Sequence, residues 1–200
     1  MNPSRRKKPK TLNSSKAHIA LGLSGGVDSA TSAALLLSQG YRVTGVTCVF
    51  NDADAGTALG IDHVVYDVRE IFREQVIDPF ITDCAQGLTP APCVTCNRFC
   101  KIPVLCQAAD DLGCEKIATG HYARVVEDTA LHRFALKRAL DEAKDQTYML
   151  SLLKQDQLSR LVLPLGGYTK QEVRQYAVDQ GIPVAKRPES QDLCFVAGDY

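Results

Sequence analysis

Residues 17–29 read AHIALGLSGGVDS, and this stretch decides the fold. Its first seven residues form a short apolar run that stops at two adjacent glycines, which is typical of a buried strand. From Asp28 onward, alanine and leucine recur at helical spacing until Gly40 ends the pattern. A second apolar run, YRVTGVTCVF, follows at residues 41–50. The stretch therefore predicts a βαβ unit with a right-handed crossover.

The rest of the chain continues the alternation of strands and helices. We expect strands at 63–68, within 115–126 and at 132–139, and helices at 69–85 and 98–112 with a proline-broken loop between them. Thr169 and Glu172 form a capping box that starts one more helix, which Gly181 ends. This order predicts an α/β fold, a doubly wound parallel sheet with helices on both faces.

Composition limits the class of protein. The chain has 200 residues, of which 45% are hydrophobic and 23% charged, and its formal net charge is zero. No apolar run approaches the roughly 20 residues that cross a bilayer, so we expect a cytoplasmic protein without a membrane partner. Balanced charge gives no indication of DNA as a partner. Basic residues concentrate in 1–16, which we expect to be a disordered leader and not a secretory signal.

The most specific motif is SGGVDS at residues 24–29, between the first expected strand and helix. A helix N-terminus presents unpaired N–H groups, adjacent glycines let the backbone approach an anion, and the two serine hydroxyls can donate to phosphate oxygens. A turn that only packs helix on strand would explain the glycines but not Ser24, Asp28 and Ser29. The loop lacks both the Walker ending and GxGxxG. It resembles the signature of the PP-loop ATP pyrophosphatases, which implies ATP cleavage to AMP with Mg²⁺ near Asp28.

Cysteine chemistry indicates what the AMP is used for. Eight cysteines without an export signal favour reduced thiols over a disulfide scaffold. Cys96 lies in the loop TPAPCVTCN and Cys194 in SQDLCFV. An adenylated carbonyl oxygen is a good leaving group that sulfur can displace, and a persulfide on one cysteine can deliver that sulfur while the other forms a disulfide. Amide-forming synthetases, which share the loop and use a small-molecule acceptor, remain an alternative.

Six motifs in order carry a closer resemblance, over about residues 17–198. They are SGGVDS, TPAPCVTCN, ATGHYAR, KDQTYML, LPLGGYTKQEVR and ESQDLCF. Together they are similar to the tRNA-specific 2-thiouridylases of the MnmA type, which replace O2 of the wobble uridine with sulfur. The resemblance implies ATP and Mg²⁺ as cofactors, tRNA as a partner, and a cysteine desulfurase or sulfur-relay protein as the sulfur donor.

The resemblance also implies roles for individual residues. Cys96 corresponds to the catalytic nucleophile and Cys194 to the persulfide cysteine. Cys48 occupies a place where a methionine usually contacts adenine. The ATP-binding positions are Gly22, Leu23, Ser24, Gly25, Gly26, Val27, Asp28, Ser29, Cys48 and Gly120. The positions expected against the target base or tRNA are Ala91, Pro92, Cys93, Lys144, Asp145 and Gln146. From the sequence alone, Asp145 and Gln146 could equally cap a helix, and we expect Cys84, Cys106 and Cys114 to be small buried hydrophobes.

One departure from the family concerns the cysteine loop. The family reads Asn-Pro-Asp where this chain has Ala91-Pro92-Cys93, so a carboxylate that could orient the base or move a proton is replaced by a thiol. The change also creates Cys93-x-x-Cys96. With Cys194, these thiolates could hold a [4Fe–4S] cluster, and a cluster-dependent tRNA thiolase is an alternative to the persulfide mechanism. Zinc is disfavoured because only one CxxC pair exists.

Domain organisation follows from the same resemblance. We expect an ATP-binding catalytic domain at 17–164, and a helix with the persulfide-cysteine segment at 165–200 that begins a linker region, with the family's C-terminal β-barrel absent. The connection at 51–59 is shorter than expected. Loss of the barrel and of the loop aspartate leaves a third alternative, a PP-loop nucleotide-binding module without thiolase activity, because phosphate contacts supply most tRNA affinity.

Overall fold

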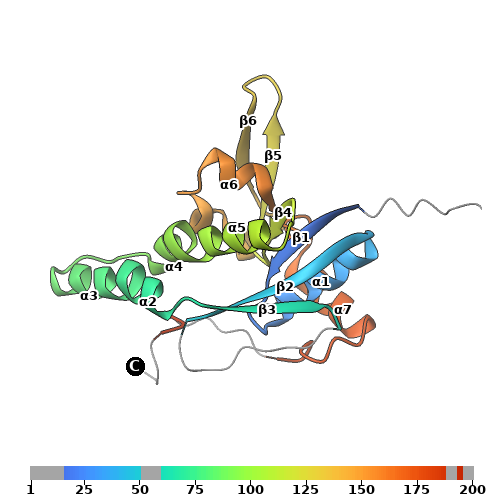
Figure 1. Cartoon of the computed structure of the whole chain (residues 1–200), viewed down its shortest axis with the longest axis horizontal. Coiled ribbons are helices and arrows are strands. Elements are labelled where there is room, and N and C mark those ends of the chain that lie inside the picture. The colour runs from blue at the N-terminus through green and yellow to red at the C-terminus, as the bar shows by residue number, and fades with distance from the viewer. Residues whose placement is uncertain (1–15, 51–59, 188–192, 196–200) are drawn as a thin grey trace, which may run out of the picture.

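The computed structural model describes residues 16–50, 60–187 and 193–195 (Figure 1). Five parallel strands form the central sheet in the order β3-β2-β1-β4-β7. Their bounds are Lys16–Gly22 (β1), Tyr41–Val49 (β2), Asp62–Asp67 (β3), Lys116–Ala118 (β4) and Leu161–Val162 (β7). The expected leader, the 51–59 connection and most of the ESQDLCF motif lie outside the described residues.

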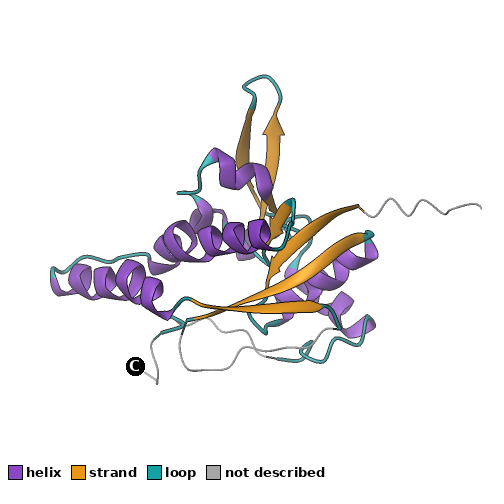
Figure 2. Cartoon of the chain, in the orientation of Figure 1, coloured by secondary structure: helices purple, strands orange, loops and turns teal. Residues whose placement is uncertain are grey.

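Helices connect and cover these strands (Figure 2). The α-helices are α1 (Val27–Ser38), α2 (Arg69–Phe72), α3 (Asp78–Ala85), α4 (Pro92–Cys96), α5 (Ile102–Asp111), α6 (Gln155–Arg160) and α7 (Lys170–Asp179). Two π-helical segments, Arg73–Ile77 and Asn97–Lys101, and two 3₁₀ turns, Glu142–Lys144 and Thr147–Leu150, complete the helical structure. No helix in the described part of the chain is long and apolar enough to cross a membrane.

The core lies on both sides of β1, whose alternate side chains point to opposite faces. Ile19 and Leu21 belong to the same buried cluster as Leu36 of α1. Ala20 belongs to a second cluster with Leu105 of α5. All five side chains are almost completely buried. The predicted doubly wound sheet with helices on both faces is therefore confirmed.

Prolines shape the two longest helical stretches. Each π-helical segment ends two residues before a proline, at Pro79 and Pro103. Proline lacks the N–H that an α-helix needs and its ring crowds the carbonyl four residues earlier, so a wider turn accommodates it. The helix predicted to start at residue 98 begins at Pro92 instead, because proline is favoured in the first helical turn. That correction moves Cys93 and Cys96 from a loop onto a helix.

Two further predictions meet different outcomes. The strands at 115–126 and 132–139 contribute only β4 to the parallel sheet, and β5 (Ala123–Asp128) and β6 (Arg133–Arg138) form a separate antiparallel hairpin. This hairpin projects from the sheet at the top of Figure 1. The capping box of α7 is confirmed: Thr169 accepts a hydrogen bond from the N–H of Glu172, whose side chain bonds back to Thr169.

The segment before α7 approaches the hairpin closely at one glycine. Gly166 is buried, and a Cβ added there would clash with the backbone carbonyl of Ala123. Neighbouring Gly167 is exposed and has open space around its Cα. We expect Gly166→Ala to lower the free energy of unfolding by about 2–3 kcal/mol, because backbone must move to relieve the overlap. Gly167→Ala, the matched control, should stay within about 0.5 kcal/mol. Urea denaturation measures both, and equal values would contradict the close approach.

Candidate functional site

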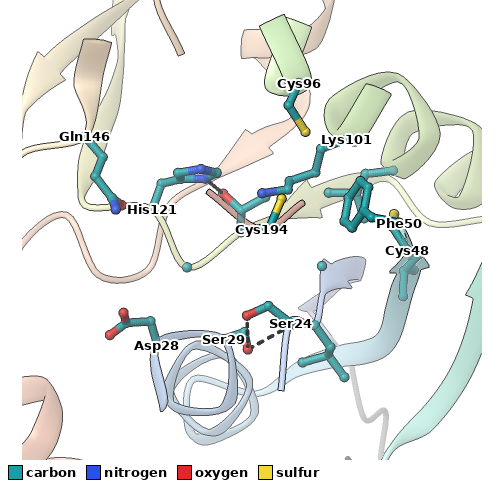
Figure 3. Close-up of a pocket in the computed structure, with 16 residues that line it drawn as sticks. Ser24, Asp28, Ser29, Cys48, Phe50, Cys96, Lys101, His121, Gln146 and Cys194 are labelled. Carbon is teal, nitrogen blue, oxygen red and sulfur yellow. Dashed lines mark hydrogen bonds between the residues drawn. The ribbon is translucent and has the colours of Figure 1, made fainter. Parts of the chain in front are cut away.

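A cavity of about 480 Å³ opens where the loops after β1 and β4 diverge (Figure 3). In doubly wound sheets, ligands bind at this point, where the strand order reverses direction. The cavity is lined by Gly22, Leu23, Ser24, Asp28, Ser29, Val46, Cys48, Phe50, Cys96, Lys101, Leu105, Thr119, Gly120, His121, Gln146 and Cys194. The topology therefore brings together side chains that are far apart in the sequence.

The SGGVDS loop forms one wall of this cavity. The backbone N–H of Ser24 donates to Ser29 Oγ at 3.3 Å, and Ser29 Oγ donates to the carbonyl of Gly26 at 3.1 Å. Gly25 has φ of 72°, a left-handed conformation that glycine adopts without strain. These contacts shape the loop at the start of α1, where the helix macrodipole favours an anion.

Gly120 lies on the opposite loop and allows close packing. A Cβ at this position would lie 3.0 Å from the carbonyl carbon of Asp28 and 3.1 Å from the nitrogen of Ser29. Glycine is favoured because a side chain here would crowd the backbone at the start of α1, which would have to shift to accommodate it. The loop after β4 is therefore in direct contact with the start of α1 at Gly120, beside the cavity.

Asp28 sits in an ion pair with a residue from α7. Lys170 Nζ lies 2.8 Å from both carboxylate oxygens of Asp28, and Tyr122 donates to Oδ1 at 2.9 Å. Lys170 is 8% exposed. The pair joins the start of α1 to the start of α7. Mg²⁺ is usually held by one or two carboxylates together with substrate phosphates. Asp28 could supply such a carboxylate beside the SGGVDS loop, and that role stays a prediction.

The cavity extends past β2 to an apolar end formed by Val46, Cys48 and Phe50. Burial raises the pKa of Cys48 to about 11, so its thiol stays neutral. An apolar end opposite a phosphate loop suits the flat base of a nucleotide. This places Cys48 where the family resemblance predicts adenine contact, and that role stays a prediction.

Cys96 and Cys194 both line the cavity, on the side that faces Ser24 and Ser29 (Figure 3). The two residues also line a second, smaller cavity of about 80 Å³ together with Pro92 and Cys93. Among the target-base residues, Pro92 is buried and Cys93 exposed, and Ala91 is the N-cap of α4. The predicted pair of reactive cysteines and the predicted phosphate loop therefore share one site.

Cys96 is the most acidic thiol among the described residues with a shifted pKa. A hydrogen bond from Cys100 lowers the pKa of Cys96 to about 7, against the effect of burial, with help from the charge and backbone of Lys101. The pKa of Cys100 is raised in turn, mainly because its thiol is the donor in that bond. Burial raises the pKa of Cys194. Near neutral pH, Cys96 is therefore the cysteine that carries a substantial thiolate fraction.

His121 lines both cavities and is almost completely buried. Burial lowers its pKa to about 3, and the charge of Lys101 acts in the same direction. Its Nδ1 is hydrogen-bonded to Thr119 Oγ1 at 2.7 Å. His121 is therefore neutral in the physiological range and can hydrogen-bond a ligand without adding charge.

A metal cluster does not fit the described residues. Within 16–50, 60–187 and 193–195, no group of three or more histidine, cysteine, aspartate or glutamate side chains is arranged to hold a metal ion. A cluster on Cys93, Cys96 and Cys194 would require at least such a group. No reaction step is therefore assigned to a [4Fe–4S] cluster.

Comparisons with known proteins identify the family of the chain. A family model described as the tRNA methyl transferase HUP domain matches residues 17–56 and 50–198. The chain belongs to this family. A tRNA-specific 2-thiouridylase MnmA from Syntrophomonas wolfei is 47% identical over 91% of this chain and 56% of its own length. The MnmA of Treponema denticola is 46% identical over 90% of this chain and 54% of its own length. The chain thus spans about half the length of the curated relatives it matches.

Two solved structures are similar to the chain in fold. A predicted subunit of tRNA methyltransferase from Methanocaldococcus jannaschii has a TM-score of 0.51 and 19% identity, covering 82% of this chain and 76% of its own. A 4-thiouridine synthetase in complex with RNA and ATP has a TM-score of 0.52 and 15% identity, covering 90% of this chain and 45% of its own. Both likenesses support the α/β PP-loop fold.

The three residues expected against tRNA lie on one turn but differ in surroundings. Gln146 lines the main cavity, and its side chain accepts a hydrogen bond from the N–H of Tyr122. Asp145 Oδ1 accepts hydrogen bonds from the Ala139 N–H and the Thr147 hydroxyl, which hold this turn together. Lys144 ends the 3₁₀ turn and is half-buried. Contact with tRNA stays a prediction for all three.

The sequence did not predict the roles of two lysines near the cavity. Lys101 follows the cysteine loop but has no distinguishing sequence pattern. Lys170 lies within the motif LPLGGYTKQEVR, for which the sequence indicated no role at the site. Only the fold brings them to the cavity and to Asp28. Of the three cysteines predicted to be buried hydrophobes, Cys114 is buried, Cys106 is half-buried, and Cys84 is exposed on α3, which has no buried residue.

The hydrogen bond between Cys100 and Cys96 makes a pH-dependent prediction. In the wild type, alkylation of Cys96 by iodoacetamide should rise with pH and reach half its maximum rate near pH 7, where the thiolate forms. In Cys100→Ala the donor is lost, the pKa of Cys96 rises, and the midpoint should move upward by about one pH unit.

Cys100→Ser is the matched control, because its hydroxyl can still donate and should keep the midpoint lower than in Cys100→Ala. Peptide mass spectrometry at a series of pH values measures the rate at Cys96 itself. An identical midpoint in the wild type and Cys100→Ala would show that this bond does not set the thiolate fraction.

Proposed function

We propose that this chain is the ATP-dependent catalytic part of a tRNA uridine 2-sulfurtransferase. One observation carries the proposal: Cys96, Cys194 and the SGGVDS loop line the same cavity. Sulfur chemistry on an adenylated substrate requires the nucleotide and both thiols at one place, and the site meets that requirement. The similarity to MnmA enzymes over about nine-tenths of the chain supports the choice of acceptor.

In the first step, the SGGVDS loop binds the phosphates of ATP and the Val46–Phe50 end of the cavity takes the base. The uridine C2 oxygen attacks the α-phosphorus, the bond to the β-phosphate oxygen breaks, and pyrophosphate leaves. Asp28 would hold Mg²⁺, which neutralises phosphate charge when bound. Before the metal binds, the ammonium group of Lys170 neutralises the charge of the Asp28 carboxylate.

In the second step, a persulfide on Cys194 supplies the sulfur. Its outer sulfur attacks C2, AMP leaves with the former carbonyl oxygen, and Cys194 becomes joined to C2 through two sulfur atoms. The Cys96 thiolate then attacks the Cys194 Sγ, and the bond between the two former persulfide sulfurs breaks. The electron pair stays with the sulfur on C2, which becomes the thiocarbonyl, and a Cys96–Cys194 disulfide remains. The low pKa of Cys96 favours this role.

Two partners complete the proposal. The target is a uridine in tRNA, because the similar proteins are tRNA-specific 2-thiouridylases. The sulfur comes from a cysteine desulfurase or a sulfur-relay protein that loads Cys194. Exposure of Cys194 gives such a donor access.

Thiolation of tRNA tests the proposal directly. We expect the chain, with ATP, Mg²⁺, a desulfurase with cysteine, and tRNA lacking 2-thiouridine, to give RNA that is retarded in a mercury-containing gel. Cys96→Ser and Cys194→Ser should each lower the rate about a thousandfold or more, because each removes an essential bond-forming sulfur. Cys84→Ser, on exposed α3, should leave it unchanged.

The alternatives give different results in the same assay. Release of pyrophosphate without RNA that is indifferent to Cys194→Ser would indicate a small-molecule acceptor. Binding of ATP without release of pyrophosphate would indicate a nucleotide-binding module. Either pattern, together with tRNA that is not retarded, would overturn the proposal.

A further inference from the structure

Three cysteines surround the second cavity. Cys93 and Cys96 lie on α4, and Cys194 lies on the opposite segment with Leu193 and Phe195. Cys93 is exposed and Cys96 is 7% exposed. The charges of the three sulfurs influence one another, since Cys93 and Cys96 both act on the pKa of Cys194. The proposed reaction uses only two of these thiols and leaves Cys93 without a task.

The position of Cys93 favours thiol exchange with Cys96. The two residues are three apart in the first turn of a helix, where side chains at this spacing share a face with Cβ atoms about 5–6 Å apart. A disulfide needs about 3.5–4.5 Å, so a small adjustment of the first turn suffices. Burial raises the pKa of the Cys93 thiol and the charge of Lys101 opposes that effect, so the attacking thiolate of Cys93 forms more readily as the pH rises. The pair is thus built like a redox dithiol, with an exposed and a buried sulfur.

We propose that Cys93 is a resolving thiol, which breaks the Cys96–Cys194 disulfide and returns Cys194 for a new sulfur load. This inference rests on the proposed function, because that reaction generates the disulfide. It assigns the Cys93–Cys96 pair as a second redox site of the protein and an external dithiol as its reductant.

The exchange balances without an added oxidant. The Cys93 thiolate attacks Cys96 Sγ, a Cys93–Cys96 bond forms, and the Cys96–Cys194 bond breaks. The electron pair leaves on Cys194, which takes up a proton equivalent to the one that Cys93 lost. The external dithiol then reduces the Cys93–Cys96 disulfide and is itself oxidised to a disulfide.

Other cysteines near the site are less suited to this step. Cys100 is hydrogen-bonded to Cys96 but is completely buried and lines neither cavity, so an external reductant cannot reach it. Cys48 is on β2 and lines only the larger cavity. Cys93 alone among these three is exposed. Of these three, Cys93 is therefore the thiol that an external dithiol can reach, while Cys194, which is also exposed, is the sulfur that the exchange frees.

Disulfide mapping tests the assignment without ATP or tRNA. The reduced chain is treated with one equivalent of diamide, quenched at intervals by alkylation, and analysed as disulfide-linked peptides by mass spectrometry. In the wild type we expect Cys96–Cys194 to appear and convert to Cys93–Cys96. In Cys93→Ser we expect Cys96–Cys194 to persist, and its reduction by dithiothreitol to slow about tenfold. Exposed Cys84 supplies the control variant Cys84→Ser, which should behave as the wild type.

Turnover gives a second measurement that separates this inference from the proposed function. With limiting reductant, the ratio of later turnovers to the first should fall about tenfold in Cys93→Ser and stay constant in Cys84→Ser. Equal ratios, equal disulfide maps, or reduction at equal rates would overturn the role of Cys93 while leaving tRNA thiolation intact. Failure of the wild type to thiolate tRNA at all, with the disulfide exchange observed, would overturn the proposed function and not the redox pair.

Discussion

Parallel pairing of β1 with β2 on one side and β4 on the other is the constraint on which the site depends. Because both neighbours run parallel to β1, the loops after β1 and β4 leave the sheet at the same edge. The chain continues from β1 toward β2 and from β4 toward β7, so no crossover covers the space between these two loops. At this edge, Gly120 packs so closely against the backbone of Asp28 and Ser29 that a side chain on residue 120 would crowd them. The position of the cavity is thus a consequence of strand order, and the residues that line it set its chemistry.

The charged side chains near the cavity either neutralise one another or shift the pKa of a neighbouring group. Lys170 neutralises Asp28 from α7, and removing one partner of such a buried pair typically costs about 3–5 kcal/mol. Lys101 lies beside Cys96 and lowers its pKa, and it also lowers that of His121. The same lysine therefore favours a thiolate and a neutral imidazole. Both effects suit a site that receives phosphates and a nucleophilic sulfur.

The sequence was sufficient for features with a local cause. The apolar run and paired glycines of residues 17–29, and the capping box at Thr169, predict their elements because the deciding contacts lie within a few residues. β7 has two residues and no pattern of its own, and it is a strand only because β4 offers it a free edge. The pairing of Lys170 with Asp28 spans 142 residues. No spacing or composition rule encodes such a contact, so these parts required the three-dimensional fold.

The replacement of the family's loop aspartate by Cys93 changes which chemistry the second cavity supports. Among the residues that the structure describes, this cavity is lined by no carboxylate, and His121 is held neutral with a pKa of about 3. General acid or base catalysis therefore has little to work with beside the cysteines. Exchange between sulfurs has different needs: thiolates, proximity and a route for electrons. Cys96 supplies the thiolate, the first turn of α4 supplies proximity, and the exposed Cys93 supplies the route. Under the proposed roles, a thiol that transfers electrons stands where the resemblance places a carboxylate that could transfer a proton.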